Sequence, residues 1–213
     1  MTIANVSEVS SRDKILDAAE TLFAQRGYSG VGLREVAEAV GLGKSSLFHH
    51  FKNKPELYAA VCARILGRIG GRLEQTLAQG GTPVERLERL LDELADVLAG
   101  HPNDARLLLR SLFEDDDLPG DTAEERAAHE ALEKIIVAMT ALLREGMSQG
   151  QLRAANVQHL LLTVIGQIVF PFASGDFGRE LLGKDVFDKA EVARRKQEVR
   201  DLLRYGLIVR PES

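Results

Sequence analysis

The chain has 213 residues, of which 45% are hydrophobic, and its 27 basic and 32 acidic side chains give a formal net charge of −5 at pH 7. A chain of this length buries a sizeable core and has room for one small and one larger domain. The single cysteine, Cys62, excludes an internal disulfide framework and a multi-cysteine zinc site, and it predicts a reducing, cytoplasmic location. Residues 1–14 lack the apolar segment of a secretory signal, and the most apolar stretch, residues 160–173, is too short to span a bilayer, so we expect no membrane partner.

Residues 31–51 predict two short helices joined by a tight turn, the helix-turn-helix arrangement. Apolar residues recur at helical spacing on the first helix, at Leu33, Val36, Ala37 and Val40. Gly41 can adopt the left-handed conformation that ends a helix, and Leu42 fills the corner. On the second helix we expect Leu47, Phe48 and Phe51 to continue the apolar stripe. This leaves a polar face that suits the major groove of DNA, made of Lys44, Ser45, Ser46, His49 and His50.

Positive charge is concentrated around this motif, although the whole chain is acidic. Between residues 26 and 54 the basic side chains Arg26, Arg34, Lys44, Lys52 and Lys54 are opposed by Glu35 and Glu38, which gives a local net charge of +3. The acidity lies elsewhere, above all in the Glu-Asp-Asp-Asp run at residues 114–117. Phosphate contacts require cations only on the docking face, and an acidic body disfavours other orientations. The charge distribution is therefore compatible with DNA binding.

The rest of the chain predicts successive helices and no strand. A long helix begins near Pro55 and ends before the glycines at 80 and 81, and the glycines at 67, 70 and 71 weaken its middle. Pro83 begins a helix that runs to about Leu98, a shorter helix carries residues 107–113, and residues 115–121 form a loop. An amphipathic helix follows, with one apolar stripe made of Leu132, Ile135, Ile136, Met139, Leu142, Leu143 and Met147.

The last two predicted long helices differ in character. Residues 157–170 are apolar on nearly every face except at Thr163 and Gln167, so this helix must be covered on all sides, by its own chain and by a second copy. Residues 174–185 contain glycines and predict a loop or a short helix. The final helix, residues 188–207, is polar in its first half and apolar at its end.

Together, these segments resemble the tetracycline-repressor-like (TetR) family of transcriptional regulators at its DNA-binding end. The resemblance is carried by residues 15–23 (ILDAAETLF), 27–28 (GY), 34–37 (REVA), 40–44 (VGLGK) and 47–57 (LFHHFKNKPEL). It covers roughly residues 12–58, and the order and spacing of its parts make it more specific than a bare helix-turn-helix pattern. Beyond that stretch only the all-helical layout agrees.

The resemblance implies an all-α protein with two domains. Residues 1–56 are expected to form a three-helix DNA-binding domain, with the helix-turn-helix at about 32–51. Residues 57–213 are expected to form a helical domain for ligand binding and dimerisation. The implied DNA contacts come from Arg34, Lys44, Ser45, Ser46, Phe48, His49, His50 and Lys52.

The sequence departs from the family pattern at several positions of the motif. Gly32 and Gly43 replace the hydroxyl residues that usually cap the two helices, so we expect no side-chain cap there, at a cost of a few tenths of a kcal/mol. Phe48 and His50 stand where tyrosines are common, which removes two phenol donors, although His50 can still reach a phosphate, better when protonated. Ser45 replaces a frequent glycine, so its side chain points toward the bases.

By the same resemblance, the protein is a homodimeric repressor that leaves a palindromic operator on double-stranded DNA when a small, largely apolar effector binds among the central helices. The helix that begins near Pro55 joins both domains and transmits the change. Dimerisation is expected through residues 157–172 and 188–207, and this mechanism needs no catalysis, cofactor or metal. Candidate polar anchors for the effector are Arg106, Arg110, His129, Thr163 and Gln167.

Other chemical motifs in the chain are incomplete. Residues 41–45 end like a phosphate-binding loop, but Glu38 occupies the place of its first glycine, and a helix precedes it instead of a strand. The zinc motif His-Glu-x-x-His begins at His129 but has Glu133 in place of its second histidine. The acidic run at 114–117 can hold a hard cation but is typical of a solvated loop. The alternative function is an all-helical enzyme or adaptor with a helix-turn-helix-like corner, which requires a convergent polar constellation that the spacing does not provide.

Overall fold

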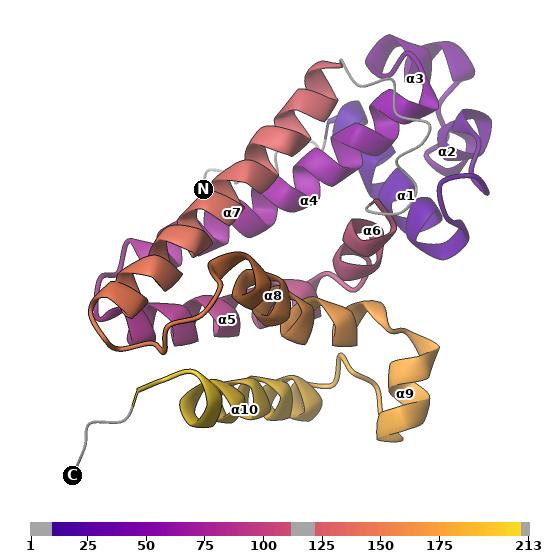
Figure 1. The fold of residues 1–213 in the computed structure, drawn as a ribbon. Helices are drawn as coiled ribbons and strands as arrows, with labels where there is room; N and C mark the ends of the chain where they lie inside the picture. Colours follow the sequence, from indigo (N-terminus) through magenta and orange to yellow (C-terminus); the bar gives the residue numbers. More distant parts are fainter. Residues whose placement is uncertain (1–9, 112–121, 210–213) are drawn as a thin grey trace, which may run out of the picture.

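The computed structural model describes residues 10–111 and 122–209, and within these ranges the chain forms ten helices and no strand (Figure 1). The N-terminal helices are α1 (Ser11–Arg26), α2 (Leu33–Ala39), α3 (Lys44–His50) and α4 (Lys54–Leu77). The others are α5 (Pro83–Gly100), α6 (Asp104–Ser111), α7 (Ala123–Ser148), α8 (Val157–Ala173), α9 (Asp176–Leu182) and α10 (Lys189–Gly206). The expected all-α class is confirmed.

Local hydrogen bonds at the helix starts explain where the elements of the N-terminal region begin. At α4, the side-chain oxygen Oδ1 of Asn53 accepts the N–H of Glu56 at 2.8 Å. The motif helices α2 and α3 begin after Gly32 and Gly43 without a side-chain cap, as predicted. At α2 the carboxylate of Glu35 reaches back and accepts the N–H of Gly32 at 2.8 Å. One orphan donor of this short helix is therefore still satisfied.

Helix α4 belongs to both halves of the molecule. Its first turns bury Leu57, Tyr58 and Val61 in the same core as the inner face of α1. Its later turns lie alongside α7, while α5, α8 and α10 complete the body (Figure 1). One continuous helix therefore connects the DNA-binding end with the helical body.

Two apolar residues predicted to face the core are exposed, which corrects the predicted stripes. The exposed fraction is 38% for Phe48 and 39% for Ile136. Successive residues of a helix project about 100° apart, so a residue directly after an inward-facing one turns toward solvent. Leu47 and Phe51, four positions apart, share the inward face and are fully buried.

Several predicted boundaries change at the C-terminal end. Helix α8 continues beyond the expected end at Phe170 to Ala173, with Pro171 inside it. Residues 174–185 include the short helix α9, one of the two alternatives. The acidic run 114–117, Phe113 and the predicted loop 115–121 lie outside the described residues. In the described chain no single helix has both the length and the apolarity to cross a bilayer; α8 and α9 reach that composition only together, with a bend of 92° between them.

Candidate nucleic-acid interface and effector groove

The outer face of α3 is accessible to a partner, as the sequence predicts. Beneath it, Leu47 and Phe51 are fully buried and fix the rotation of the helix about its axis. The ammonium of Lys44 lies 5.3 Å from the centroid of the Phe48 ring, so the exposed ring supports this cation at the start of α3. The remaining side chains of the face are exposed or half-buried, namely Ser45, Ser46, His49 and His50.

The turn between α2 and α3 aims this face away from the body. Gly41 has a φ of +68°, the left-handed conformation that glycine adopts without strain. The N–H of Leu42 donates to the carbonyl oxygen of Ala37 at 2.9 Å, which closes the end of α2. Helix α3 consequently stands at the opposite end of the molecule from α10 (Figure 1).

The cations near α3 differ in whether a carboxylate neutralises them. Arg26 Nη1 lies 2.8 Å from Glu35 Oε1, so this pair is locally neutral. The hydrogen bond from the Gly32 N–H and then the charge of Arg26 hold the pKa of Glu35 below its ordinary value. Within the described residues no carboxylate pairs with the three exposed cations Arg34, Lys44 and Lys52. These three side chains are available for phosphate groups.

The end of α3 is fixed relative to α4. The backbone N–H of Lys52 donates to the carboxylate of Glu56 at 2.7 Å, which leaves the Lys52 side chain exposed beside α3. The rings of His49 and His50 are 5.7 Å apart and inclined at 71° to each other. The described part of the chain holds no group of three or more His, Cys, Asp or Glu residues able to bind a metal.

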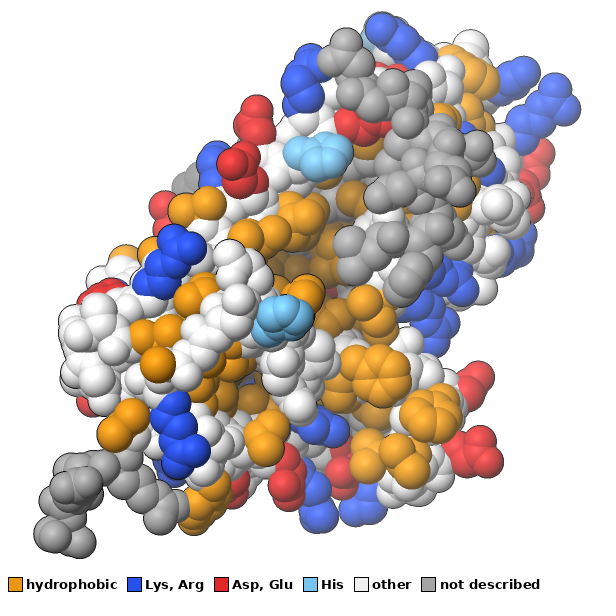
Figure 2. Space-filling model, viewed as in Figure 1, with side chains coloured by type: hydrophobic (Ala, Val, Ile, Leu, Met, Phe, Trp, Pro, Cys, Tyr) orange, Lys and Arg blue, Asp and Glu red, His pale blue; other side chains and the backbone are white. Residues whose placement is uncertain are grey.

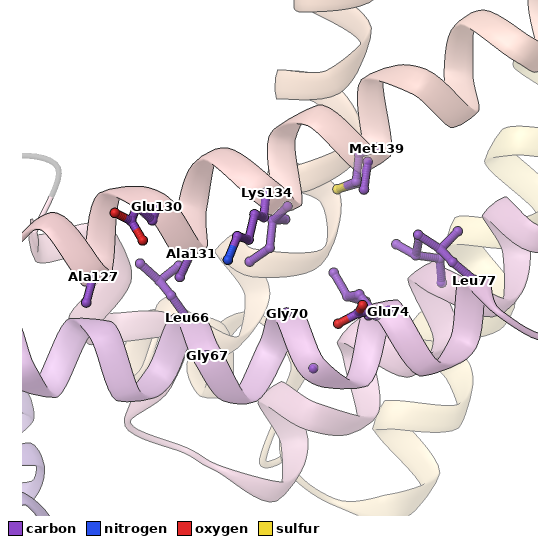
Figure 3. A pocket seen from close by; sticks show the side chains of 15 residues that line it. Leu66, Gly67, Gly70, Glu74, Leu77, Ala127, Glu130, Ala131, Lys134 and Met139 are labelled. Atoms are coloured by element: carbon purple, nitrogen blue, oxygen red, sulfur yellow. The ribbon is translucent and has the colours of Figure 1, made fainter.

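A groove with a volume of about 520 Å³ lies between α4 and α7 (Figure 3). Its volume arises from the glycines of α4. A Cβ atom built on Gly67 or Gly71 would meet no other atom within 4 Å, and one on Gly70 would lie 3.6 Å from Ile135 Cγ1. The backbone of α4 thus forms one wall, and the missing side chains leave space that a ligand can fill.

The chemistry of the groove is mainly apolar. Leu73, Leu90 and Met139 line its buried part. The charged residues of the lining are Glu74 of α4 and Glu130 and Lys134 of α7, all exposed. The sequence did not predict a ligand-binding role for any of these residues. The relevant signal in the sequence is the glycine group in the middle of α4, which predicts a weak point of the helix as readily as space for a ligand.

Two of the predicted effector anchors, Arg106 and Arg110, lie on α6 outside the groove. Arg110 Nη1 donates to the carbonyl oxygen of Phe23 at 2.9 Å and so joins α6 to the end of α1. Arg106 lies against Gly175, where an added Cβ would clash with its guanidinium group. These contacts give both arginines structural roles, and their part in effector binding stays a prediction.

The other three predicted anchors also lie outside the groove. His129 is exposed on α7, with its Nδ1 atom 3.0 Å from the carbonyl oxygen of Glu125. Thr163 Oγ1 donates within α8 to the carbonyl oxygen of His159 at 2.9 Å. Thr163 and Gln167 line a separate hollow on α8. The structure does not bring the five residues together.

The outer surface of α8 is unusually apolar, and the mainly polar α10 adds an exposed leucine near its end. The exposed fraction is 71% for Leu162, 55% for Phe170 and 53% for Leu202. The same kind of surface continues on α9 with Phe177 and Leu181, and Figure 2 shows hydrophobic side chains gathered over this part of the molecule. Exposed apolar patches of this kind mark contact surfaces in proteins. The surface coincides with the two segments predicted to contact a second copy.

A network of ion pairs joins α1, α4 and α6, a junction that the sequence analysis did not predict. Arg64 Nη2 lies 2.5 Å from Glu20 Oε2 and its Nη1 lies 2.7 Å from Asp17 Oδ1. Arg68 donates through Nε and Nη2 to the two carboxylate oxygens of Asp104, at 3.2 and 2.9 Å. Arg64 and Arg68 lie on the same helix as the groove glycines, so the junction connects the groove to α1.

Comparison with known proteins agrees with this architecture. The family described as bacterial regulatory proteins, tetR family, matches residues 15–61, and the tetracyclin repressor-like C-terminal domain matches residues 83–203. The transcriptional repressor KstR2 of Mycolicibacterium smegmatis is 37% identical over 81 residues, which are 38% of this chain and 40% of that protein. The chain therefore spans about two fifths of the length of this curated relative.

Solved structures show the same fold over nearly the whole chain. A fatty acid metabolism regulator of Clostridium perfringens superposes with a TM-score of 0.73 at 20% identity, covering 92% of this chain and 100% of that one. The regulator FadR of Bacillus subtilis, solved with stearoyl-CoA, superposes with a TM-score of 0.69 at 20% identity over 89% and 96%. Since proteins of this family are transcriptional regulators and not enzymes, the enzyme alternative is not retained. With the C-terminal domain match alone extending over more than half of the sequence, the chain belongs to the TetR family of bacterial transcriptional regulators.

Proposed function

We propose that this protein is a homodimeric repressor that binds a palindromic operator through α3 and releases it when a small, largely apolar effector occupies the groove between α4 and α7. The observation that carries the DNA-binding part is the exposed face of α3. Lys44 at the start of α3, Lys52 just after its end and Arg34 on the neighbouring α2 have no carboxylate partner among the described residues, although the chain as a whole is acidic. Such a surface attracts phosphates at one end of the molecule.

Dimerisation is supported by the apolar surface of α8 and α10. Leu162, Phe170 and Leu202 are more than half exposed, and a second copy would remove them from water. A two-fold axis through this surface repeats α3 at both outer ends of the dimer. Two such helices match two half-sites of a palindrome, with a spacing that the dimer sets.

Release is supported by the position of the groove on α4. Gly67, Gly70 and Gly71 line the groove, and α4 begins directly after the DNA-binding end. An effector that binds one arrangement of α4 more tightly shifts the equilibrium toward it, and such coupling typically amounts to 1–3 kcal/mol, about 5- to 150-fold in affinity. Arg64 and Arg68 would transmit this shift to α1 through Glu20.

Selection of bound fragments from random duplex DNA, followed by anisotropy titrations over a range of salt concentrations, tests the proposal. We expect a palindromic sequence whose affinity falls with salt, and Ser46→Ala or His49→Ala should change the preferred bases. Leu162→Glu should give monomers in sedimentation experiments and lose affinity for the full palindrome more than for a half-site. Absence of salt-dependent DNA binding by the wild-type protein would contradict the proposed function.

A further inference from the structure

The groove between α4 and α7 is lined by more negative than positive side chains. Figure 3 shows Lys134 along the groove between Glu130 and Glu74, so one ammonium lies between two carboxylates. Within the described residues, none of the three side chains forms an ion pair with another group. The lining therefore carries a net charge of −1, which attracts a cationic ligand group and repels an anionic one.

The remaining lining determines the shape and polarity of the rest of the ligand. Leu73, Leu90 and Met139 offer a buried apolar surface, and the glycines of α4 leave room beside it. The groove follows two long helices (Figure 3), and its three charged side chains are exposed to solvent and form its rim. A ligand that fills it places an apolar body against α4 and a polar group at the rim.

We propose that the effector is a cationic amphiphile, an elongated apolar molecule with a single positively charged group attracted by both Glu130 and Glu74. This inference rests on the proposed function, because a ligand of the groove is an effector only if the protein is a regulator. The chemical class of the ligand follows from the groove itself. A carboxylate or phosphate at the same place would have one favourable neighbour, Lys134, and two unfavourable ones. An acyl-CoA thioester, whose polar part is anionic, is therefore disfavoured here.

Calorimetric titration at low salt with decyltrimethylammonium and with decanoate, which have equal chain lengths, tests the proposal. The wild-type protein should bind the ammonium compound about fivefold or more tightly than the carboxylate, and salt should reduce this preference. Glu130→Gln should weaken binding of the cation about threefold, and Lys134→Met should strengthen it by a similar factor. Each substitution should have the opposite effect on decanoate.

Glu133→Gln is the matched control, because Glu133 is exposed on the same helix, carries the same charge and does not line the groove. It should change the affinity for the cation much less than Glu130→Gln does. Gly71→Leu, which puts a side chain into the groove, should abolish binding of the cation and thereby locate it. Tighter binding of decanoate, equal binding of both compounds, binding of neither, or equal effects of the two glutamate substitutions would overturn the proposal.

Failure of this inference can be separated from failure of the proposed function. The titrations need no DNA and decide the ligand class alone. Operator titrations without any ligand decide whether the protein is a DNA-binding regulator. If decyltrimethylammonium occupies the groove but leaves operator affinity unchanged, the proposed role of the cation as effector is overturned while DNA binding stands.

Discussion

The DNA-binding end and the junction of α1, α4 and α6 use arginine, lysine and carboxylate side chains for opposite tasks. At α3 the cations Lys44 and Lys52 are exposed, and no carboxylate among the described residues pairs with them. At the junction, Arg64 and Arg68 are each held by carboxylates. A cation that the fold leaves unpaired is more available to phosphate than one already held by a carboxylate, so the comparison separates side chains available to DNA from those that hold the helices together.

The DNA-binding end and the junction also differ in how deeply their charged side chains are buried. The side chain of Asp104 is completely buried, and desolvation raises its pKa to about 6 even though the charge of Arg68 acts in the opposite direction. Exposed ion pairs contribute little to stability, whereas loss of one partner of a buried pair is costly because the other charge remains in the interior. The junction should therefore be sensitive to substitutions that the DNA-binding end tolerates.

The largest expected effect is that of Arg68→Met. It leaves Asp104 buried without its bidentate partner, so we expect the free energy of unfolding to fall by about 3 kcal/mol at pH 7. Urea denaturation measures this change. Arg72→Met is the matched control on the same helix, since the exposed Arg72 pairs with Glu93 at the surface, and it should cost less than about 1 kcal/mol. Similar losses for the two variants would remove the distinction between buried and exposed pairs.

The next effect concerns the pH dependence of stability. The pKa of Asp104 is higher in the folded protein, about 6, than its ordinary value of 3.8, so between these values the folded state binds a proton that the unfolded state does not. The contribution of Asp104 to stability is therefore lost as the pH rises from about 4 to about 6. We expect Asp104→Asn to remove this dependence. The difference in free energy of unfolding between the variant and the wild type should therefore change by about 2 kcal/mol between pH 4.5 and pH 7.

His101 affects the pH dependence of stability with the opposite sign. Its pKa is lowered by burial and then by the charge of Arg68, so its contribution to stability grows as the pH rises toward 6.5. Because His101 is present in both proteins, the difference between Asp104→Asn and wild type isolates the carboxyl group. A difference that does not vary between pH 4.5 and pH 7 would contradict the raised pKa of Asp104.

At the DNA-binding end the expected loss is smaller and concerns affinity instead of stability. Lys52→Ala removes one exposed, unpaired cation, so binding should weaken by about 1 kcal/mol for every sequence, and the slope of log affinity against log salt should decrease by about one. The free energy of unfolding should stay the same. Arg144→Ala, which removes an exposed cation on α7 outside the groove and outside the proposed dimer surface, is the control and should change neither quantity.

The same comparison shows which features of the molecule can be predicted from the sequence. The helix-turn-helix depends on short contiguous signals, such as Gly41 at the turn and the spacing of Leu47 and Phe51, and the structure agrees with both. The helix face on which a single residue lies was harder to predict, since Phe48 was expected in the core and is exposed. Contacts such as that between Arg64 and Glu20, 44 positions apart, depend on how whole helices dock, and local patterns do not contain this information.

The groove was missed for the same reason. Glycines in the middle of α4 lower helix propensity wherever they occur, and only the docking of α7 shows that their missing side chains create a cavity. The predicted anchors were chosen as polar residues on apolar helices, but Thr163 and Gln167 lie on the outer face of α8. A polar residue on an apolar helix is satisfied as well by a surface as by a ligand.

The smallest effect is expected at Gly71, on the helix that both regions share. A methyl group there meets no atom within 4 Å, so Gly71→Ala should raise the free energy of unfolding by about 0.5–1 kcal/mol through helix propensity and leave the salt slope of DNA binding unchanged. Gly146→Ala is the contrasting variant, because its Cβ would lie 2.7 Å from Leu152 Cδ1 and should destabilise the fold. Thermal unfolding of both variants measures the two signs. If Gly71→Ala altered the salt slope, the packing of α4 would itself set the phosphate contacts, and the separation between the two regions would not hold.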